Sequence, residues 1–414
     1  MTPSYVAEIL PEHLPDGALS IAVFGPGEGE AIVVRLPDGS VGVVDGCREP
    51  TSGDPVAELL AKFAAKTADP AAFRLHFVCL THPHADHYRG LGRLIKAYEG
   101  RIDHLWTVTH VTPQYEKALP AWLELVHAGS APDLDDLDGL KRVLNSFHDE
   151  KPRVEKTNAA GFAHLACDTR LIGARLFGGY KLEIEACGPA PGDIDSVQKQ
   201  LIALLTAAAS SGVVSRTHDP NLTSGAVLIR WGQAAVLLAG DLLRGDEHHS
   251  GWQRARLQIT HPVQVVNVAH HASKEAHDDT LWKTMKPKLA IVTPFKFGKS
   301  PNPPRPDRIE LLARSAKVAI TSPPDWKGEL GPPVGERLLS PNTFVPRNGA
   351  LPPIVPKNRH DARNNAVAVS LDPTGKITQL ILAGQADLYA MPPGATRRRT
   401  RVARPRRRAK RRKC

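Results

Sequence analysis

Short apolar runs that end in polar residues recur along this chain. Continuous runs of this length, flanked by turn-forming residues, predict buried β-strands. In a layered α/β fold the carboxyl ends of strands converge, and ligands bind where they do. We therefore expect the polar residues after these runs to form one site. The runs are residues 41–44, 74–80, 234–239, 263–269 and 289–292, and they lead into Asp45-Gly46, Thr81-His82, Gly240-Asp241, His270-His271 and Thr293-Pro294.

Other segments carry the patterns of hairpins and helices. Residues 18–46 predict a hairpin pair, residues 171–187 a hairpin around Gly178-Gly179, and residues 365–383 a C-terminal hairpin that either extends one sheet or forms a small appendix. We interpret residues 114–150, with an acidic stretch at 133–138, as a helical insertion that caps the site. Apolar residues at helical spacing predict helices over 55–66, 91–98, 121–127, 140–147 and 197–209, and one after Pro306 that leads to a short strand at 318–321.

The stretch Thr81-His82-Pro83-His84-Ala85-Asp86-His87 carries the strongest chemical signal. It follows a predicted strand and precedes a predicted helix, so it is expected on an exposed strand-to-helix turn. Imidazole and carboxylate groups suit zinc, iron or manganese. One short turn cannot wrap all four of these groups around one ion, so some of them must serve a second metal. The alternative, four solvated loop residues, does not explain why histidines cluster in this way.

The motif residues resemble those of the metallo-β-lactamase fold superfamily. The resemblance rests on His82-Pro83-His84, Asp86-His87, Gly240-Asp241 and His270-His271-Ala272-Ser273, and it covers roughly residues 18–325. Within the superfamily the chain resembles the hydrolase domain of competence-type DNA-uptake proteins, through residues 27–31, 221–224, 286–293 and 304–306. The resemblance implies an α/β fold: a four-layer αββα metallo-β-lactamase sandwich, here with the helical insertion, a C-terminal hairpin and a basic tail.

The resemblance also implies roles for individual residues. His82 and His84 would hold a first ion, Asp86 and His87 a second, and Asp241 would bridge both. One of His270 and His271 would complete the second site, and the other would donate a proton or a hydrogen bond in the transition state, so the catalytic set is Asp86, His270 and His271. Asp45 is expected to accept a hydrogen bond from a ligand imidazole, and Asn221 to support the ligands from outside.

A third histidine for the first ion is a point on which this chain departs from many members of the superfamily. The candidates are His164 and His218, but the branch that Asn221 suggests commonly lacks this histidine. The implied cofactors are two divalent ions, zinc or manganese, bridged by a hydroxide, or one ion if the third histidine is absent. Ala272 stands where the family usually has glycine.

Cysteine usage and hydropathy restrict the cellular setting. Five cysteines are scattered without CxxC spacing, which predicts reduced thiols and a cytoplasmic protein. Residues 1–15 lack the pattern of a signal peptide, and no run approaches eighteen apolar residues. We expect no membrane span, and the sequence does not identify a protein partner.

The net charge of +10 lies in the last residues of the chain. Residues 397–413 hold 12 of the 53 basic residues and no acid, so the remainder has 41 basic and 43 acidic residues, a net charge of −2. Such a block predicts a disordered arm that binds nucleic acid; a solubility tail, an anionic-membrane contact or a targeting signal are the alternatives. Its basic residues are Arg397, Arg398, Arg399, Arg401, Arg404, Arg406, Arg407, Arg408, Lys410, Arg411, Arg412 and Lys413.

These observations predict a hydrolase domain at 1–325, a Pro-rich linker with a β-hairpin at 326–390, and a disordered Arg-rich tail at 391–414. The preferred function is a metal-dependent phosphodiesterase or nuclease acting on DNA or RNA. The alternative is a small-molecule ester, lactone or phosphocholine-type hydrolase whose tail serves only localisation. A binding module with a vestigial metal site is disfavoured, because every acid and histidine of the core motif is present.

Overall fold

Two stacked β-sheets form the centre of the protein. The computed structural model describes residues 3–26, 29–47, 54–108, 134–210, 220–245, 249–295, 302–324 and 364–389. Within these residues the first sheet runs through β1 (Ser4–Val6), β16 (Ile377–Ala383), β15 (Ala366–Leu371), β2 (Leu19–Phe24), β3 (Ala31–Arg35), β4 (Val41–Val44), β5 (Phe77–Leu80), β6 (Leu105–Val108) and β7 (Phe162–Leu165). The second runs through β17 (Asp387–Leu388), β14 (Lys317–Ile320), β13 (Leu289–Val292), β12 (Val265–Asn267), β11 (Ala234–Leu238), β10 (Ala226–Trp231), β9 (Tyr180–Gly188) and β8 (Thr169–Phe177).

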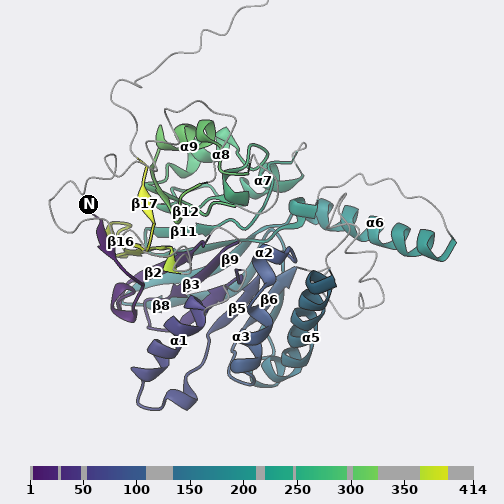
Figure 1. The fold of residues 1–414 in the computed structure, drawn as a ribbon, viewed down its shortest axis with the longest axis horizontal. Coiled ribbons are helices and arrows are strands. Elements are labelled where there is room, and N and C mark those ends of the chain that lie inside the picture. Colours follow the sequence, from purple (N-terminus) through teal and green to yellow (C-terminus); the bar gives the residue numbers. More distant parts are fainter. Residues whose placement is uncertain are drawn as a thin grey trace, which may run out of the picture.

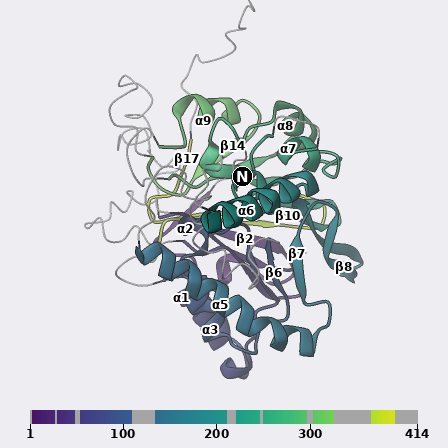
Figure 2. The same cartoon turned by 90° about the vertical axis from the view of Figure 1, so that its right-hand side faces the viewer.

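Helices cover the outer face of each sheet (Figure 1). The first sheet carries α1 (Pro55–Ala65), α3 (Leu91–Ala97) and α5 (Leu134–Thr157), and the second carries α7 (Gly251–Ala255), α8 (Asp279–Met285) and α9 (Pro306–Ala313). The helix α6 (Pro191–Ser210) begins six residues before the predicted start and projects outward, toward the viewer in Figure 2. Short helical segments are α2 (Ala85–Tyr88), η1 (Pro11–His13), η2 (Pro70–Ala72), η4 (Pro220–Thr223) and η5 (Ala269–Ala272). The arrangement is the four-layer αββα sandwich expected from the sequence.

Alternation along the strands builds two apolar cores. Successive side chains of a strand point to opposite faces of its sheet. In β10, Val227 and Ile229 pack in the core between the two sheets, whereas Ala226 and Leu228 pack with Trp252 in the core under the outer helices. Strands buried on both faces need continuous apolar runs, which is why these segments could be recognised in the sequence.

Parallel strands bring the polar ends of the predicted runs to one edge of the sandwich. The strands β4 to β7 are parallel in the first sheet, and β11 to β14 are parallel in the second. A backbone hydrogen bond from the Gly225 amide to the Thr81 carbonyl, 2.7 Å long, ties the two sheets together at this edge. The site described below lies there.

The C-terminal hairpin belongs to the first sheet. Its strand β15 pairs with β2 from Leu19 to Phe24 along the whole length of β2, and its strand β16 pairs with the N-terminal strand β1. Of the two alternatives for residues 365–383, the structure therefore shows the extended sheet. The boundary predicted at residue 325 does not separate this hairpin from the sheet that carries half of the site.

The predicted insertion is described only from residue 134 onward. Residues 134–157 form one continuous helix, α5, which runs through most of the predicted acidic stretch and packs against α3 on the outside of the first sheet. The Ser146 hydroxyl contacts the Gly92 carbonyl at 3.4 Å. The predicted helix at 121–127, the Pro-rich linker up to residue 363 and the basic tail lie outside the described residues. Among those that are described, no helix is both long and apolar enough to cross a membrane.

Candidate metal centre

The motif turn joins β5 to α2 at the site edge. The amide of His87 donates to the carbonyl of His84 at 2.9 Å, which closes the first turn of α2. The rings of His82 and His87 lie 4.2 Å apart, and those of His82 and His84 4.6 Å apart. The expectation of an exposed turn is wrong for His82 and His87, whose side chains are fully buried, while His84 and Asp86 remain partly exposed. Residues of the second sheet cover them.

Asp241 approaches this turn from the end of β11. Gly240 before it has a φ of +50°, and a Cβ at this position would lie 2.7 Å from the Gly225 carbonyl oxygen. Only glycine fits this turn without strain. The Asp241 amide donates to the Ser224 hydroxyl at 2.9 Å, which fixes the aspartate backbone beside the motif.

Three consecutive residues after β12 adopt left-handed backbone conformations. His270, His271 and Ala272 have φ values of 48°, 53° and 63°, each of which costs a non-glycine residue about 1–3 kcal/mol. Ala272 therefore takes a conformation that glycine adopts without strain. The segment is held by hydrogen bonds from the His270 amide to the Gly240 carbonyl (3.0 Å) and from the Ser273 amide to the His270 carbonyl (2.8 Å). Strain of this kind, held in place by the surrounding fold, is typical of functional sites.

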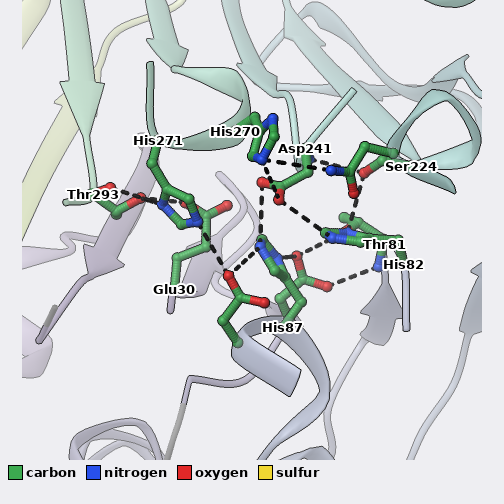
Figure 3. Close-up of polar contacts among 12 residues, drawn as sticks. Glu30, Thr81, His82, His87, Ser224, Asp241, His270, His271 and Thr293 are labelled. Carbon is green, nitrogen blue, oxygen red and sulfur yellow. Dashed lines mark hydrogen bonds and ion pairs between the residues drawn. The ribbon is translucent and has the colours of Figure 1, made fainter. Parts of the chain in front are cut away.

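The polar side chains converge into two groups that share Asp241 (Figure 3). Its Oδ1 lies 3.3 Å from His87 Nε2, and its Oδ2 lies 3.5 Å from His82 Nε2. The two oxygens of one carboxylate thus face different imidazoles. Within each group the potential ligand atoms lie within 4.8 Å of one another; the groups are His82, His84 and Asp241, and Asp86, His87, Asp241 and His271.

These residues fit divalent metal ions. The buried atoms His82 Nε2, His87 Nε2 and Asp241 Oδ1 have no hydrogen-bond partner among the described residues, although buried polar atoms are rarely left unpaired. Imidazole nitrogens and carboxylate oxygens are the ligands that zinc and manganese accept. An ion in each group would give these atoms the partners that they lack. A further possible ligand group consists of Glu30, Asp45 and His87. In it, Asp45 already accepts hydrogen bonds from Thr81 and His87.

The two adjacent histidines have different environments. His271 is buried, and its Nε2 lies 3.2 Å from Asp86 Oδ2 in the second group. The His270 side chain is 28% exposed and belongs to neither group; its Nε2 stands 3.9 Å from Asp241 Oδ2. The Asn221 amide lies 3.5 Å from His270 Nε2, and the Ser273 hydroxyl lies 3.1 Å from Nδ1. Asn221 thus contacts the exposed histidine, which the sequence did not distinguish from His271.

Asp45 and Thr81 orient the buried imidazoles. One carboxylate oxygen of Asp45 accepts from the Thr81 amide at 2.7 Å, and the other lies 2.8 Å from His87 Nδ1. The Thr81 hydroxyl donates to Asp45 at 2.6 Å and lies 3.1 Å from His82 Nδ1, while the Ser224 hydroxyl lies 3.2 Å from the same nitrogen. If these oxygens accept the Nδ1 proton of each histidine, Nε2 is the atom left to bind a metal ion, and in both rings it faces Asp241.

Burial and charge act against each other in this site. Burial lowers the pKa of His84 to about 3, and burial together with His87 also lowers the pKa of His82. For Asp86 and Asp241 burial opposes ionisation, but His87 and the other neighbouring histidines together outweigh it and hold the pKa of both carboxyls below the usual range. Neutral imidazole at His82 and His84 and ionised carboxylate at the two aspartates are the forms that bind metal.

Neither candidate for a third histidine joins the first group within the described residues. His164 lies on β7, next to Phe162, and takes part in none of the ligand groups. His218 lies outside the residues that the structure describes. The first group therefore offers His82, His84 and Asp241.

Glu30 and Ser224 were not predicted as site residues, and Thr81 and Thr293 were expected there only as polar strand ends without a role. Serine, threonine and glutamate beside strands are common in turns, so their type alone indicates no role. Glu30 offered the clearest available signal, because an acidic residue directly precedes the apolar strand 31–34.

Replacing Asp45 with asparagine should lower the affinity for one metal ion about 10–100-fold. If the side-chain oxygen of the new asparagine accepts from the backbone amide of Thr81, its side-chain NH₂ group faces His87 Nδ1. This arrangement favours the His87 tautomer with the proton on Nε2, and a protonated Nε2 cannot bind metal. Competition with a chelator measures the loss. The matched control is Asp103→Asn, since Asp103 lies 3.4 Å from Nδ1 of His76 away from the site. Equal affinities in Asp45→Asn and the wild type would contradict this role.

Comparison with known proteins gives one matching family and several similar solved structures of low sequence identity. The family model of the metallo-beta-lactamase superfamily matches residues 24–294. Similar solved structures include human tRNase Z, short form (13% identity, covering 66% of this chain and 92% of that one, TM-score 0.31), and Igni18, a metallo hydrolase from Ignicoccus hospitalis (11%, 72% and 94%, 0.34). Zn²⁺-bound PqqB from Methylobacterium extorquens is similar at 13% identity (72% and 97%, 0.32). No curated protein matches the chain.

Proposed function

Since the chain belongs to the metallo-β-lactamase superfamily, we propose that it is a phosphodiesterase that cleaves DNA or RNA at a binuclear metal centre. Members of this superfamily are metal-dependent hydrolases that bind divalent ions, which makes the chain a metal-dependent hydrolase. The finer proposal has two parts: which residues hold the ions and act on the substrate, and which substrate is cut.

In the proposed centre, His82 and His84 hold one ion and Asp86, His87 and His271 hold the other, with Asp241 shared. The observation that supports it is that the two oxygens of Asp241 face different imidazoles, at 3.5 and 3.3 Å. When bound, two zinc or manganese ions lower the pKa of water and neutralise charge on a phosphoryl group. If His218 is no ligand, the ion at His82 and His84 is held by fewer protein groups.

His270 is the group of this chain that faces the substrate. Its partial exposure and its position beside Asp241, outside both ligand groups, let a protonated imidazole here donate to an oxygen of the substrate. Asn221 and Ser273 hold the ring from two sides. We assign His270 the transition-state hydrogen bond or the proton for the leaving oxygen, a role that typically contributes 10²–10⁴-fold.

Replacing each histidine by alanine separates the two roles. We expect His270→Ala to keep the bound metal and to lower turnover about 10²–10⁴-fold, and His271→Ala to lose metal from the second group. Elemental analysis and turnover of a small chromogenic phosphodiester give the two readouts. The control is His277→Ala, because His277 contacts Asp279 instead of the site. Loss of metal in His270→Ala, or its retention in His271→Ala, would reverse the assignment.

The substrate class rests on residues 397–413, where 12 basic residues occur without an acid. Lysine and arginine that neutralise phosphates give affinity without sequence preference, and arginine makes bidentate phosphate contacts. The net charge of −2 in the remainder favours a second candidate, a hydrolase of small esters, lactones or phosphocholine-type esters. Assays with single-stranded DNA, duplex DNA, RNA and small esters in Zn²⁺, Mn²⁺ and Mg²⁺ decide between the two. Turnover of small esters alone would contradict the nuclease.

A further inference from the structure

Glu30 is a buried carboxylate beside the metal centre that the proposed ligand set does not use. It is 2% exposed and lies directly before β3. Gly29, with a φ of +116°, lets the chain pass so close to the motif turn that a Cβ at this position would lie 2.1 Å from the Asp86 carbonyl oxygen. The Glu30 amide then donates to this carbonyl at 3.1 Å. The backbone of Glu30 is thereby fixed to the turn that carries Asp86 and His87.

The side chain of Glu30 reaches across to the second sheet. Its Oε2 accepts from the Thr293 hydroxyl at 2.8 Å and from the Asn267 side-chain amide at 3.2 Å. Asn267 ends β12, and Thr293 follows the end of β13. One residue therefore ties the motif turn of the first sheet to the strand ends of the second, beside Thr293 and His271 (Figure 3).

Thr293 transmits this contact to His271. The hydroxyl has one proton, which it donates to Glu30, so its oxygen can only accept from His271 Nδ1 at 3.1 Å. The Thr293 carbonyl oxygen accepts from the same nitrogen at 2.8 Å. Two acceptors at Nδ1 place the proton there and leave the lone pair of Nε2 facing Asp86. Oε2 of Glu30 is an acceptor whether or not Oε1 carries a proton.

We propose that Glu30 is a positioning residue that fixes the ring orientation and the tautomer of His271, through Thr293, opposite Asp86. The carboxylate does not touch the reacting atoms. It fixes the distance between the two parts of the site, which lie on different sheets. Its contact with Thr293 directs the lone pair of His271. The proposal rests on the binuclear centre proposed above, in which His271 is a ligand.

Zn²⁺ affinity of the full chain, measured by chelator competition, tests this role. We expect Glu30→Ala to weaken the binding of one ion about 10–100-fold, as is typical for groups that orient a ligand histidine. Glu30→Gln keeps an acceptor oxygen and should lose less affinity, which also covers the case in which the alanine variant does not fold. The matched control is Glu150→Gln, since Glu150 is also a buried carboxylate but accepts from the Gly100 amide at 2.8 Å, on α5. The control should retain full affinity.

A double-mutant cycle distinguishes positioning from a general loss of structure. In a His271→Ala background, Glu30→Ala should cause no further loss of Zn²⁺ affinity, because the group that it positions is gone. Additive losses would overturn the proposal, as would unchanged affinity in Glu30→Ala while His271→Ala is weakened; either result leaves the binuclear centre intact. Unchanged affinity in His271→Ala itself would overturn both the centre and the role of Glu30.

Discussion

Replacing Asp241 with alanine should remove both metal ions and lower turnover by about 10³-fold or more. Oδ1 of Asp241 faces His87 at 3.3 Å and Oδ2 faces His82 at 3.5 Å, so this one side chain serves both ligand groups. A bound metal ion contributes several kcal/mol to the transition state, and each 1.36 kcal/mol corresponds to a factor of ten in rate. His82 belongs to one group only, so His82→Ala should lose mainly one ion.

Metal content per chain by elemental analysis, with turnover of a small phosphodiester, measures both variants. Asp278→Ala is the control for loss of a buried aspartate, because Asp278 accepts from the Leu281 amide at 2.7 Å at the start of α8 and lies in no ligand group. It should keep its metal even if its melting temperature falls. Equal metal loss in Asp241→Ala and His82→Ala, or none in Asp241→Ala, would contradict the shared role of Asp241.

Most of the sandwich could be predicted because its strands are buried on both faces. A run such as 289–292 is apolar at every position, whereas a helix on the surface of a soluble protein has polar residues on its exposed face. The pairing partner of each strand was harder to predict, since pairing is set by contacts between segments that are distant in the sequence. Residues 366–371 pair with residues 19–24, and nothing local in either segment indicates the other. The same reason explains α5, whose position is decided by its contact with α3 rather than by its own pattern.

The composition of the candidate site was predicted more fully than its geometry. Ligand types are visible in the motif, and all of the candidates outside 211–219 lie on one edge of the sandwich except His164. The difference between His270 and His271 was not visible, because adjacent residues in an extended strand would simply point to opposite faces. The left-handed conformation of both residues instead turns one toward Asp86 and leaves the other beside Asp241.

The roles of the residues that orient the ligands were missed for a physical reason. Thr81, Ser224 and Thr293 act through one hydroxyl each, and Glu30 acts through contacts with residues more than 200 positions away. The contacts of Glu30 and Ser224 appear only when the two sheets are stacked, and those of Thr81 and Thr293 only when neighbouring strands are paired. A strand-end hydroxyl in sequence is indistinguishable from a turn residue, so the pattern alone predicts the ligands but not what holds them.

Deleting residues 397–414 should weaken binding to duplex DNA and flatten its salt dependence, with turnover of a small chromogenic phosphodiester nearly unchanged. Each phosphate that is neutralised contributes about −0.9 to the slope of log affinity against log salt. If half of the 12 basic residues contact phosphates, the slope should fall by about 5 units. Binding titrations at several salt concentrations measure this slope for both proteins.

A full-length variant in which glutamine replaces the same 12 basic residues separates charge from chain length. It should match the deletion, because counterion release depends on the charges and not on the backbone that carries them. The candidate ligands lie on strand ends between residues 82 and 271, so neither change should alter metal content. A slope that stays unchanged in both variants would mean that this segment does not bind nucleic acid. The near-neutral remainder of the chain would then favour the small-ester hydrolase.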